Sequence, residues 1–236
     1  MKPLLIIKTG NTVASIPAAC GDFEHWIAEG LAPSPVLTVD VSAGETLPSW
    51  DAVAGAVVTG SPAMVTDRLP WSEGTATWLR AAMEQDLLPL LGICYGHQLL
   101  AHALGGTVDY HPRGREIGTT EVVLNEPAAT DALFLGLPPC FAVHVTHMQS
   151  VVTPPQGAVQ LAGNAFDPYQ GLRFANRAWG LQFHPEFDAD IMLAYVRERE
   201  QDLIAEGFDI AALRAAVRET PEAATLLQRF AALATD

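Results

Sequence analysis

Positive charge is scarce in this sequence. Lys and Arg account for 13 of the 236 residues, against 27 Asp and Glu, so the formal net charge is −14. The basic residues are scattered, and their densest group is Arg113 and Arg115 in "HPRGREIG". Because nucleic-acid binding depends on clustered Lys and Arg, we expect no nucleic-acid partner. We interpret the basic loop as a solvated turn, with contact to an anionic partner or substrate as the alternative.

Cysteines and long apolar runs are scarce as well. The 3 cysteines include no C-x-x-C pair, which argues against a disulfide framework. No stretch approaches the ~18 apolar residues of a membrane helix. Gly10 and Asn11 interrupt the first apolar run too early for a signal peptide. We therefore expect no membrane association and a cytoplasmic location, where a reactive thiol stays reduced.

Phosphate-binding and metal-binding signals are missing too. The chain contains no G-x-x-x-x-G-K loop and no "SGG", so no ATP-using step is expected of this chain alone. His144 and His147 are three residues apart in a predicted strand, where such side chains point to opposite faces. No Cys or Glu completes a ligand set at a normal spacing. We expect neither a metal nor a cofactor.

Apolar residues, by contrast, are plentiful at 49%, and they are arranged in alternating strands and helices. This alternation over the first 106 residues predicts an α/β fold with a doubly wound, mostly parallel sheet. The predicted strands are 3–10, 35–41, 54–60 and 87–93, and the predicted helices are 22–30, 71–86 and 97–104. Ligands in such folds bind beyond the carboxyl ends of the strands.

The pattern changes after residue 106. Short apolar runs separated by turn residues predict hairpins and antiparallel additions to the same sheet. These runs are 107–110, 119–124, 141–147, 158–163, 171–175 and 178–183. Helices are predicted over 188–207, 209–219 and 221–234. We expect residues 1–190 to form one domain and residues 191–236 to be a helical extension packed on it.

The most informative motif is "LLPLLGICYGHQLLAHAL", in which Cys94 lies on the turn between a predicted buried strand and a helix. Gly92 lies two residues before Cys94 and Gly96 two residues after it, and a strained nucleophile turn requires such small residues at these positions. The helix N-terminus favours thiolate over thiol. The backbone N–H of Tyr95 is positioned to stabilise an oxyanion. Cys20 and Cys140 lack such a turn, and we expect them to be buried or partly buried structural thiols.

A cysteine nucleophile needs a base and a group that orients the base. "AWGLQFHPEF" supplies both, because His184 ends an apolar run and Glu186 follows two residues later. Pro185 restricts the backbone between them, which favours a contact between the carboxylate and the imidazole.

Together, "GICYGHQ", "FHPEF" and "VVTGSP" resemble the class I, triad-type glutamine amidotransferases, and the chain is similar to stand-alone relatives of the GMP synthase amidotransferase domain. The resemblance covers about residues 1 to 190. It implies a flavodoxin-like fold and hydrolysis of the glutamine side-chain amide to glutamate and ammonia through a γ-glutamyl thioester. In that mechanism Cys94 is the nucleophile, His184 the general base and acid, and Glu186 the orienting carboxylate.

The resemblance also implies a binding site around these three residues. The loop at Gly60 and Ser61 corresponds to the one whose backbone N–H completes the oxyanion hole. Gln98 corresponds to a position that lines the glutamine pocket. The segment "VTHMQSV" corresponds to the family's Ser-His-Gly-Asp loop, so His147 and Gln149 are expected at the substrate.

That last loop departs from the family pattern, since Met148 and Gln149 replace its glycine and aspartate. The missing carboxylate removes an acceptor for the α-ammonium of free glutamine. Three functions therefore stay open. The leading interpretation is a glutaminase that works alone or passes its ammonia to a separate synthetase subunit, and the alternatives are a hydrolase of γ-glutamyl compounds and a catalytically idle binding module.

Overall fold

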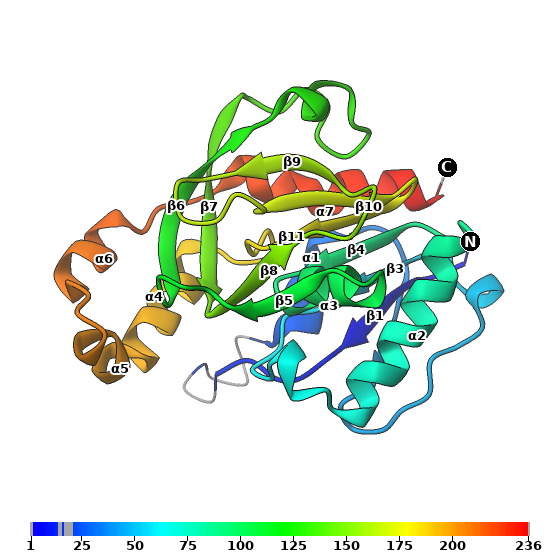
Figure 1. Ribbon diagram of the computed structural model, residues 1–236, viewed down its shortest axis with the longest axis horizontal. Helices are drawn as coiled ribbons and strands as arrows, with labels where there is room; N and C mark the ends of the chain where they lie inside the picture. The colour runs from blue at the N-terminus through cyan, green and yellow to red at the C-terminus, as the bar shows by residue number, and fades with distance from the viewer. Residues whose placement is uncertain (1, 14–15, 17–20, 236) are drawn as a thin grey trace.

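Five of the nine strands of the central sheet are parallel, and one of them leads directly into Cys94 (Figure 1). The computed structural model describes residues 2–13, 16 and 21–235. In spatial order the parallel strands are β2 (Val36–Asp40), β1 (Leu4–Lys8), β3 (Gly55–Val58), β4 (Leu90–Ile93) and β11 (Ala178–Leu181). Their carboxyl ends lie at one edge, where the sequence places Gly60, Cys94 and His184.

The sheet continues beyond β11 with strands that are each antiparallel to their neighbours. In order these are β10 (Gly171–Ala175), β9 (Val159–Gly163), β6 (Glu116–Leu124) and β7 (Cys140–His147). A separate two-stranded sheet pairs β5 (Thr107–Tyr110) with β8 (Gln149–Thr153). The predicted α/β fold, a mostly parallel doubly wound sheet with antiparallel additions, is confirmed. The strand β8 was not predicted.

The predicted direction of the strand at 178–183 is wrong. Ala178–Leu181 is not an antiparallel addition: it runs parallel to β4, with Leu181 opposite Ile93. All four of its residues are buried, as expected of a strand covered on both faces. An apolar run does not encode strand direction, which is why the sequence pattern did not show this. The parallel pairing brings the end of β11 next to the end of β4.

Helices cover both faces of the sheet because alternate residues of the strands point to opposite sides. Leu4 and Ile6 of β1 pack with α1 (Phe23–Gly30) and α7 (Pro221–Thr235). Leu5 and Ile7 pack with α2 (Pro70–Glu84) and α3 (Tyr95–Ala103). Leu226, Leu227 and Phe230 of α7 are fully or almost fully buried in the first of these cores. The boundary at residue 190 between a domain and an extension stays a prediction.

Short helices gather at one end of the molecule, beside β6 and β7 in Figure 1. They are α4 (Ala189–Glu198), α5 (Glu200–Ala205) and α6 (Ile210–Ala216). The single helix predicted over 188–207 is therefore wrong, because the backbone leaves the helical conformation at Arg199 (φ −96°, ψ 11°). Met192 and Leu203 on either side of this break pack into one apolar cluster with Phe187 and Ile117. This cluster anchors the break next to the site described below.

Shorter 3-10 turns connect some of these elements: η2 (Trp50–Ala52), η3 (Val65–Asp67) and η4 (Glu126–Thr130). None of the helices in the described part of the chain is both long and apolar enough to cross a bilayer.

Candidate active site

Cys94 sits on a strained turn between β4 and α3. Its backbone angles are φ 51° and ψ −100°, in a region that side-chain-bearing residues rarely adopt. The turn is fixed at both ends, since the Cys94 N–H donates to the Leu181 carbonyl (2.7 Å) and its carbonyl accepts from the Gln98 N–H (3.1 Å). The residue is 7% exposed, so the thiol lies at the bottom of the site but is not sealed off. This is the geometry of a nucleophile turn.

Glycines on either side let α3 approach the sheet closely. A Cβ on Gly92 would lie 2.4 Å from the Gly96 carbonyl carbon, and a Cβ on Gly96 would lie 2.4 Å from the Val58 oxygen. Both contacts involve backbone, which cannot move aside as a flexible side chain does. The expectation that the turn needs small neighbours at these positions is confirmed.

His184 and Glu186 form a buried pair just beyond β11. The imidazole Nδ1 is 2.7 Å from the Glu186 Oε1, and both side chains are almost fully buried. The backbone N–H of His184 donates to the His144 carbonyl (2.8 Å), which fixes the residue against β7. The other ring nitrogen, Nε2, is buried without a hydrogen-bond partner of normal geometry among the described residues.

The electrostatic surroundings keep this imidazole protonated. Burial lowers the pKa of His184, but the charge of Glu186, its hydrogen bond to Nδ1 and the proximity of Cys94 outweigh burial and raise the pKa to about 10. A cationic ring at neutral pH suits a partner that is a thiolate.

Aromatic rings hold the imidazole in place. Phe187 stacks on His184 with centroids 4.1 Å apart and planes at 20°, and Phe23 stacks more distantly at 6.2 Å. Tyr195 of α4 packs in turn on Phe187 (4.9 Å). The ring orientation is thus set by packing as well as by Glu186.

Two small cavities, of about 110 and 100 Å³, open beside Cys94. The first is also lined by Gln98, His147 and Gln149, and the second by Phe23, His184 and Tyr195. The residues common to both walls are Ser61, Pro62, Cys94, Thr146 and Arg199. Cys94 therefore lies between one cavity lined by the predicted binding residues and another lined by His184, the predicted base.

The predicted oxyanion donors are Tyr95, which follows Cys94 in the chain, and Ser61, and both line the first cavity beside Cys94. Within the part of the chain that the structure describes, the backbone N–H groups of Ser61 and Tyr95 have no hydrogen-bond acceptor. Ser61 does not require the positive φ of a glycine, and its Oγ donates to the Thr9 carbonyl (2.6 Å). A Cβ on Gly60 would lie 3.1 Å from the His184 Cε1, so a larger residue there would press on the base.

The predicted substrate-binding residues come together, but their side chains are largely engaged within the protein. Gln98 Nε2 donates to the Gln149 carbonyl (2.7 Å) and to Gln182 Oε1 (3.0 Å). Gln149 Nε2 donates to Thr66 Oγ1 (2.6 Å), which leaves its own Oε1 buried and unpaired among the described residues. His147 lies between the Gln149 carbonyl (3.0 Å) and Glu116 Oε2 (2.9 Å).

Sequence reasoning missed the network that holds His147. Buried Glu116 also accepts from Asn164 Nδ2 (2.6 Å) and Gln170 Nε2 (2.7 Å), so three amide or imidazole groups converge on one carboxylate. His147, Asn164 and Gln170 lie 31, 48 and 54 residues from Glu116 in the sequence, and no local motif predicts contacts over such separations.

Two arginines at the cavity were also missed. Arg115 is buried rather than in a solvated turn, so that interpretation was wrong for this residue. Arg199, from the break between α4 and α5, lines both cavities. The signal for Arg115 was the basic loop itself, whereas nothing in the helical pattern at 188–207 indicated Arg199.

The remaining cysteine and histidine predictions have mixed outcomes. Cys140 is exposed, not buried, because it begins β7 at an edge of the sheet. Cys20 lies outside the described residues. Among the residues the structure describes, no three His, Cys, Asp or Glu side chains lie close enough to hold a metal.

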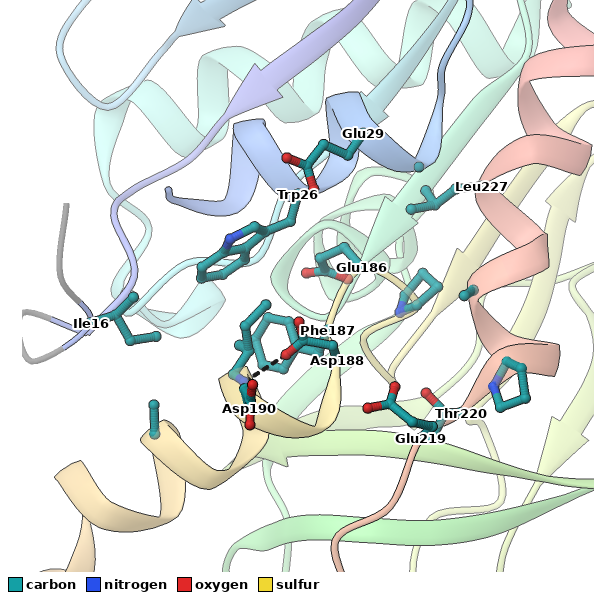
Figure 2. Close-up of a pocket in the computed structure, with 16 residues that line it drawn as sticks. Ile16, Trp26, Glu29, Glu186, Phe187, Asp188, Asp190, Glu219, Thr220 and Leu227 are labelled. Carbon is teal, nitrogen blue, oxygen red and sulfur yellow. Dashed lines mark hydrogen bonds between the residues drawn. The ribbon is translucent and has the colours of Figure 1, made fainter. Parts of the chain in front are cut away.

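A wider cavity of about 540 Å³ lies behind the triad, between α1, α4 and α7 (Figure 2). Trp26 and Glu29 reach it from α1 and Leu227 from α7, while Asp190 lies at the start of α4. It contains neither Cys94 nor His184, but Phe187 in its wall is the ring that stacks on His184. Glu186 also lines this cavity, so the cavity borders both the carboxylate and the aromatic ring that contact the imidazole.

Comparisons with known proteins identify the family of this chain. The family model "Glutamine amidotransferase class-I" matches residues 21–197. A GMP synthase [glutamine-hydrolyzing] of Aeropyrum pernix is 38% identical over 173 residues, covering 70% of this chain and 31% of the relative. Another, of Porphyromonas gingivalis, is 33% identical over 163 residues, covering 69% and 29%.

Solved structures show the same fold. A glutamine amidotransferase of Thermotoga maritima has a TM-score of 0.78 at 22% identity, covering 99% of this chain and 98% of that one. A glutamine amido transferase of Methylobacillus flagellatus has a TM-score of 0.71 at 25% identity, covering 99% and 93%.

The extent of the match qualifies what these relatives imply. The chain spans about 31% of the length of the A. pernix GMP synthase, so the activity of that whole protein does not transfer with the similarity. The family model, however, covers most of the chain, including Gly60, Cys94, His184 and Glu186. This chain belongs to the class I glutamine amidotransferase family.

Proposed function

We propose that this chain hydrolyses the terminal carboxamide of glutamine, or of a related γ-glutamyl compound, through a thioester on Cys94. The observation that carries the proposal is the strained cysteine turn at the end of β4 beside the His184–Glu186 pair at the end of β11. The cationic imidazole and the unpaired N–H groups of Ser61 and Tyr95 support it.

The first half of the reaction forms the thioester. The Cys94 Sγ attacks the amide carbonyl carbon, a C–S bond forms, and an electron pair moves onto the carbonyl oxygen. The Ser61 and Tyr95 N–H groups donate to this oxyanion. The C–N bond then breaks as the nitrogen takes the proton from His184 Nε2, and ammonia leaves.

The second half releases the acid. Neutral His184 takes a proton from water, and the hydroxide attacks the thioester carbon. Collapse breaks the C–S bond and releases the carboxylic acid and the Cys94 thiolate. The acid gives its proton to the released ammonia or to solvent and leaves as the carboxylate, while protonated His184 again pairs with the Cys94 thiolate. Glu186 stays ionised throughout and stabilises the imidazolium.

Ammonia release measured on purified protein tests this function. We expect Cys94→Ala to abolish the release of ammonia and glutamate. Cys140→Ser should leave both unchanged, because Cys140 is exposed and is not one of the three proposed catalytic residues. Equal rates for wild type and Cys94→Ala would refute the thioester mechanism. Failure of wild type with every carboxamide offered would favour the idle binding module.

We further propose that the ammonia serves a separate synthetase. Support comes from the relatives, which are named as glutamine-hydrolysing GMP synthases and are about three times as long as the matched region. A solved structure from Thermoplasma acidophilum, with a TM-score of 0.68, is described as a putative component of GMP synthase, and the match covers 94% of that chain. Co-purification of an ATP-using partner that raises the rate of ammonia release tests this second proposal.

A γ-glutamyl hydrolase is the alternative, and one observation favours it. Met148 and Gln149 stand where the family loop has glycine and aspartate, so the cavity beside Cys94 lacks that acidic group. Comparing glutamine with γ-glutamyl dipeptides as substrates of the same preparation separates the two activities.

A further inference from the structure

Arg199 lies at the end of α4, in the walls of the two cavities beside Cys94. It caps α4, where its N–H donates to the Tyr195 carbonyl (3.2 Å), and its side chain lines both cavities beside Cys94. The residue lies outside the 21–197 range that matches the family model. The helix break thus brings a positive charge from the C-terminal helices to the substrate cavity.

This positive charge is not used inside the protein. The Arg199 side chain makes no hydrogen bond or ion pair with the described residues, and its Nε is buried. A buried guanidinium N–H without an acceptor is costly, so its presence here needs an explanation. Burial, followed by repulsion from Arg115, lowers the pKa of Arg199, in keeping with a cation that lacks a partner.

The neighbouring arginine provides a contrast. Arg115 lines the same cavity but pairs with Glu206 through two contacts, Nε to Oε2 (2.9 Å) and Nη2 to Oε1 (3.0 Å). Its charge is therefore neutralised within the protein. Asp202 and Glu198 act on Arg199 only at longer range, without a direct ion pair among the described residues. The unpaired guanidinium at the cavity is that of Arg199.

The walls of the two cavities carry no opposing charge. Among the described residues that line them, none is Asp or Glu, although the chain has 27 acidic residues and a net charge of −14. A carboxylate that enters the cavity meets the free Arg199 cation, whereas an ammonium group meets no carboxylate in either wall. The charge pattern fits a carboxamide that carries a carboxylate, and it provides no carboxylate acceptor for an α-ammonium.

From this pattern, and resting on the proposed function, we infer that Arg199 binds the carboxylate of the substrate and that the substrates are ω-carboxamides of dicarboxylic acids, with no requirement for an α-amino group. Arg199 is in this view a specificity-determining residue supplied by the C-terminal helices. The planar guanidinium of Arg199 can bind a carboxylate through two parallel hydrogen bonds, which the ammonium group of a lysine cannot do as well.

Three carboxamides of the same length test the inference: glutamine, glutaramate, which lacks only the amino group, and pentanamide, which also lacks the carboxylate. We expect wild type to hydrolyse glutaramate with a kcat/KM within about tenfold of that for glutamine, and pentanamide far more slowly. Arg199→Met should lower kcat/KM for the two carboxylates by about 10- to 100-fold and leave pentanamide unchanged. For the two carboxylates, the kcat/KM of Arg199→Lys should lie between those of wild type and Arg199→Met. Arg197→Met, on the exposed side of α4, should have the kcat/KM of wild type.

The outcomes that overturn the inference are specific. An equal loss for all three substrates in Arg199→Met would show a structural role, and no loss at all would show that the carboxylate binds elsewhere. A preference for glutamine over glutaramate greater than about 100-fold would show that the α-ammonium is recognised.

A binding measurement separates this inference from the proposed function. Glutarate should raise the Tm of wild type and of Cys94→Ala, but not that of Arg199→Met, because a ligand that binds only the folded state stabilises it. If no carboxamide is hydrolysed and this pattern still holds, the proposed function fails and the carboxylate site stands. If glutarate shifts wild type and Arg199→Met equally, or shifts neither, the carboxylate site is refuted.

Discussion

The Nδ1 of His184 lies 2.7 Å from the Oε1 of Glu186, and both groups are buried. In this buried setting, the Glu186 carboxylate is the largest of the influences that raise the pKa of the imidazole. The contact therefore determines both the protonation state of the base and its orientation.

Glu186→Gln should lower kcat by about 100- to 10,000-fold while the fold is retained. Without the carboxylate, the His184 pKa should fall from about 10 toward its ordinary value of 6.5. The alkaline loss of activity, which reports deprotonation of the imidazolium, should then move to lower pH. Rate measurements across pH on both proteins check this, and an unmoved alkaline limb would contradict the assignment of Glu186.

Stability should depend on pH through the same residue. The folded-state pKa of His184 is raised above the unfolded value, so its protonation stabilises the fold fully below pH 6.5 and this contribution disappears as pH rises to about 10. The difference in free energy of unfolding between wild type and His184→Gln should therefore become smaller from pH 6.5 to pH 10. Urea unfolding at several pH values measures it, and a constant difference would show that His184 is not the titrating group.

Gly96→Ala should destabilise the protein by about 1 to 3 kcal/mol, because the added Cβ would lie 2.4 Å from the Val58 oxygen in a tightly packed layer. Gly74→Ala is the matched control, since Gly74 is also helical but has open space around it. Alanine there should stabilise α2 by up to about 1 kcal/mol. Thermal unfolding of both variants provides the comparison, and equal Tm values would contradict the close approach of α3 to β3.

Two variants that both remove the thiol test the strain at Cys94. Its φ of 51° with ψ of −100° is accessible to glycine but unfavourable for alanine. We expect Cys94→Gly to be more stable than Cys94→Ala by about 1 kcal/mol, with both inactive. Denaturant unfolding measures the difference, and a more stable alanine variant would show that the turn is not strained.

The sequence predicted the local features well, because each depended on neighbouring residues. The glycines around Cys94, the His-Pro-Glu spacing and the alternating strands and helices all produce short-range patterns, and the cysteine turn appears where they indicate. The elements that were missed depend on distant contacts. The direction of β11 is set by pairing with β4, and the helix break at Arg199 is set by packing against Phe187 and Ile117.

The polar residues around the cavity show the same division. Gln98 and His147 could be placed from motifs, but their partners Gln182 and Glu116 could not, since these lie 84 and 31 residues away. The ion pair of Arg115 with Glu206 spans 91 residues. Such distant partners decide which charged side chains are buried. The basic loop in the sequence therefore did not reveal that Arg115 is buried and Arg113 is not.

The central position of β11 has a consequence for the nascent chain. Until the ribosome has released residues 178–184, β4 has no neighbour on that side, the Cys94 N–H lacks the Leu181 acceptor, and the base is absent. Cys94 is thus synthesised well before Leu181 and His184, and the hydrogen bond that fixes its turn forms only when the last parallel strand inserts into the sheet. If Cys94 acts as proposed, the order of synthesis delays the assembly of its site until most of the chain has been made.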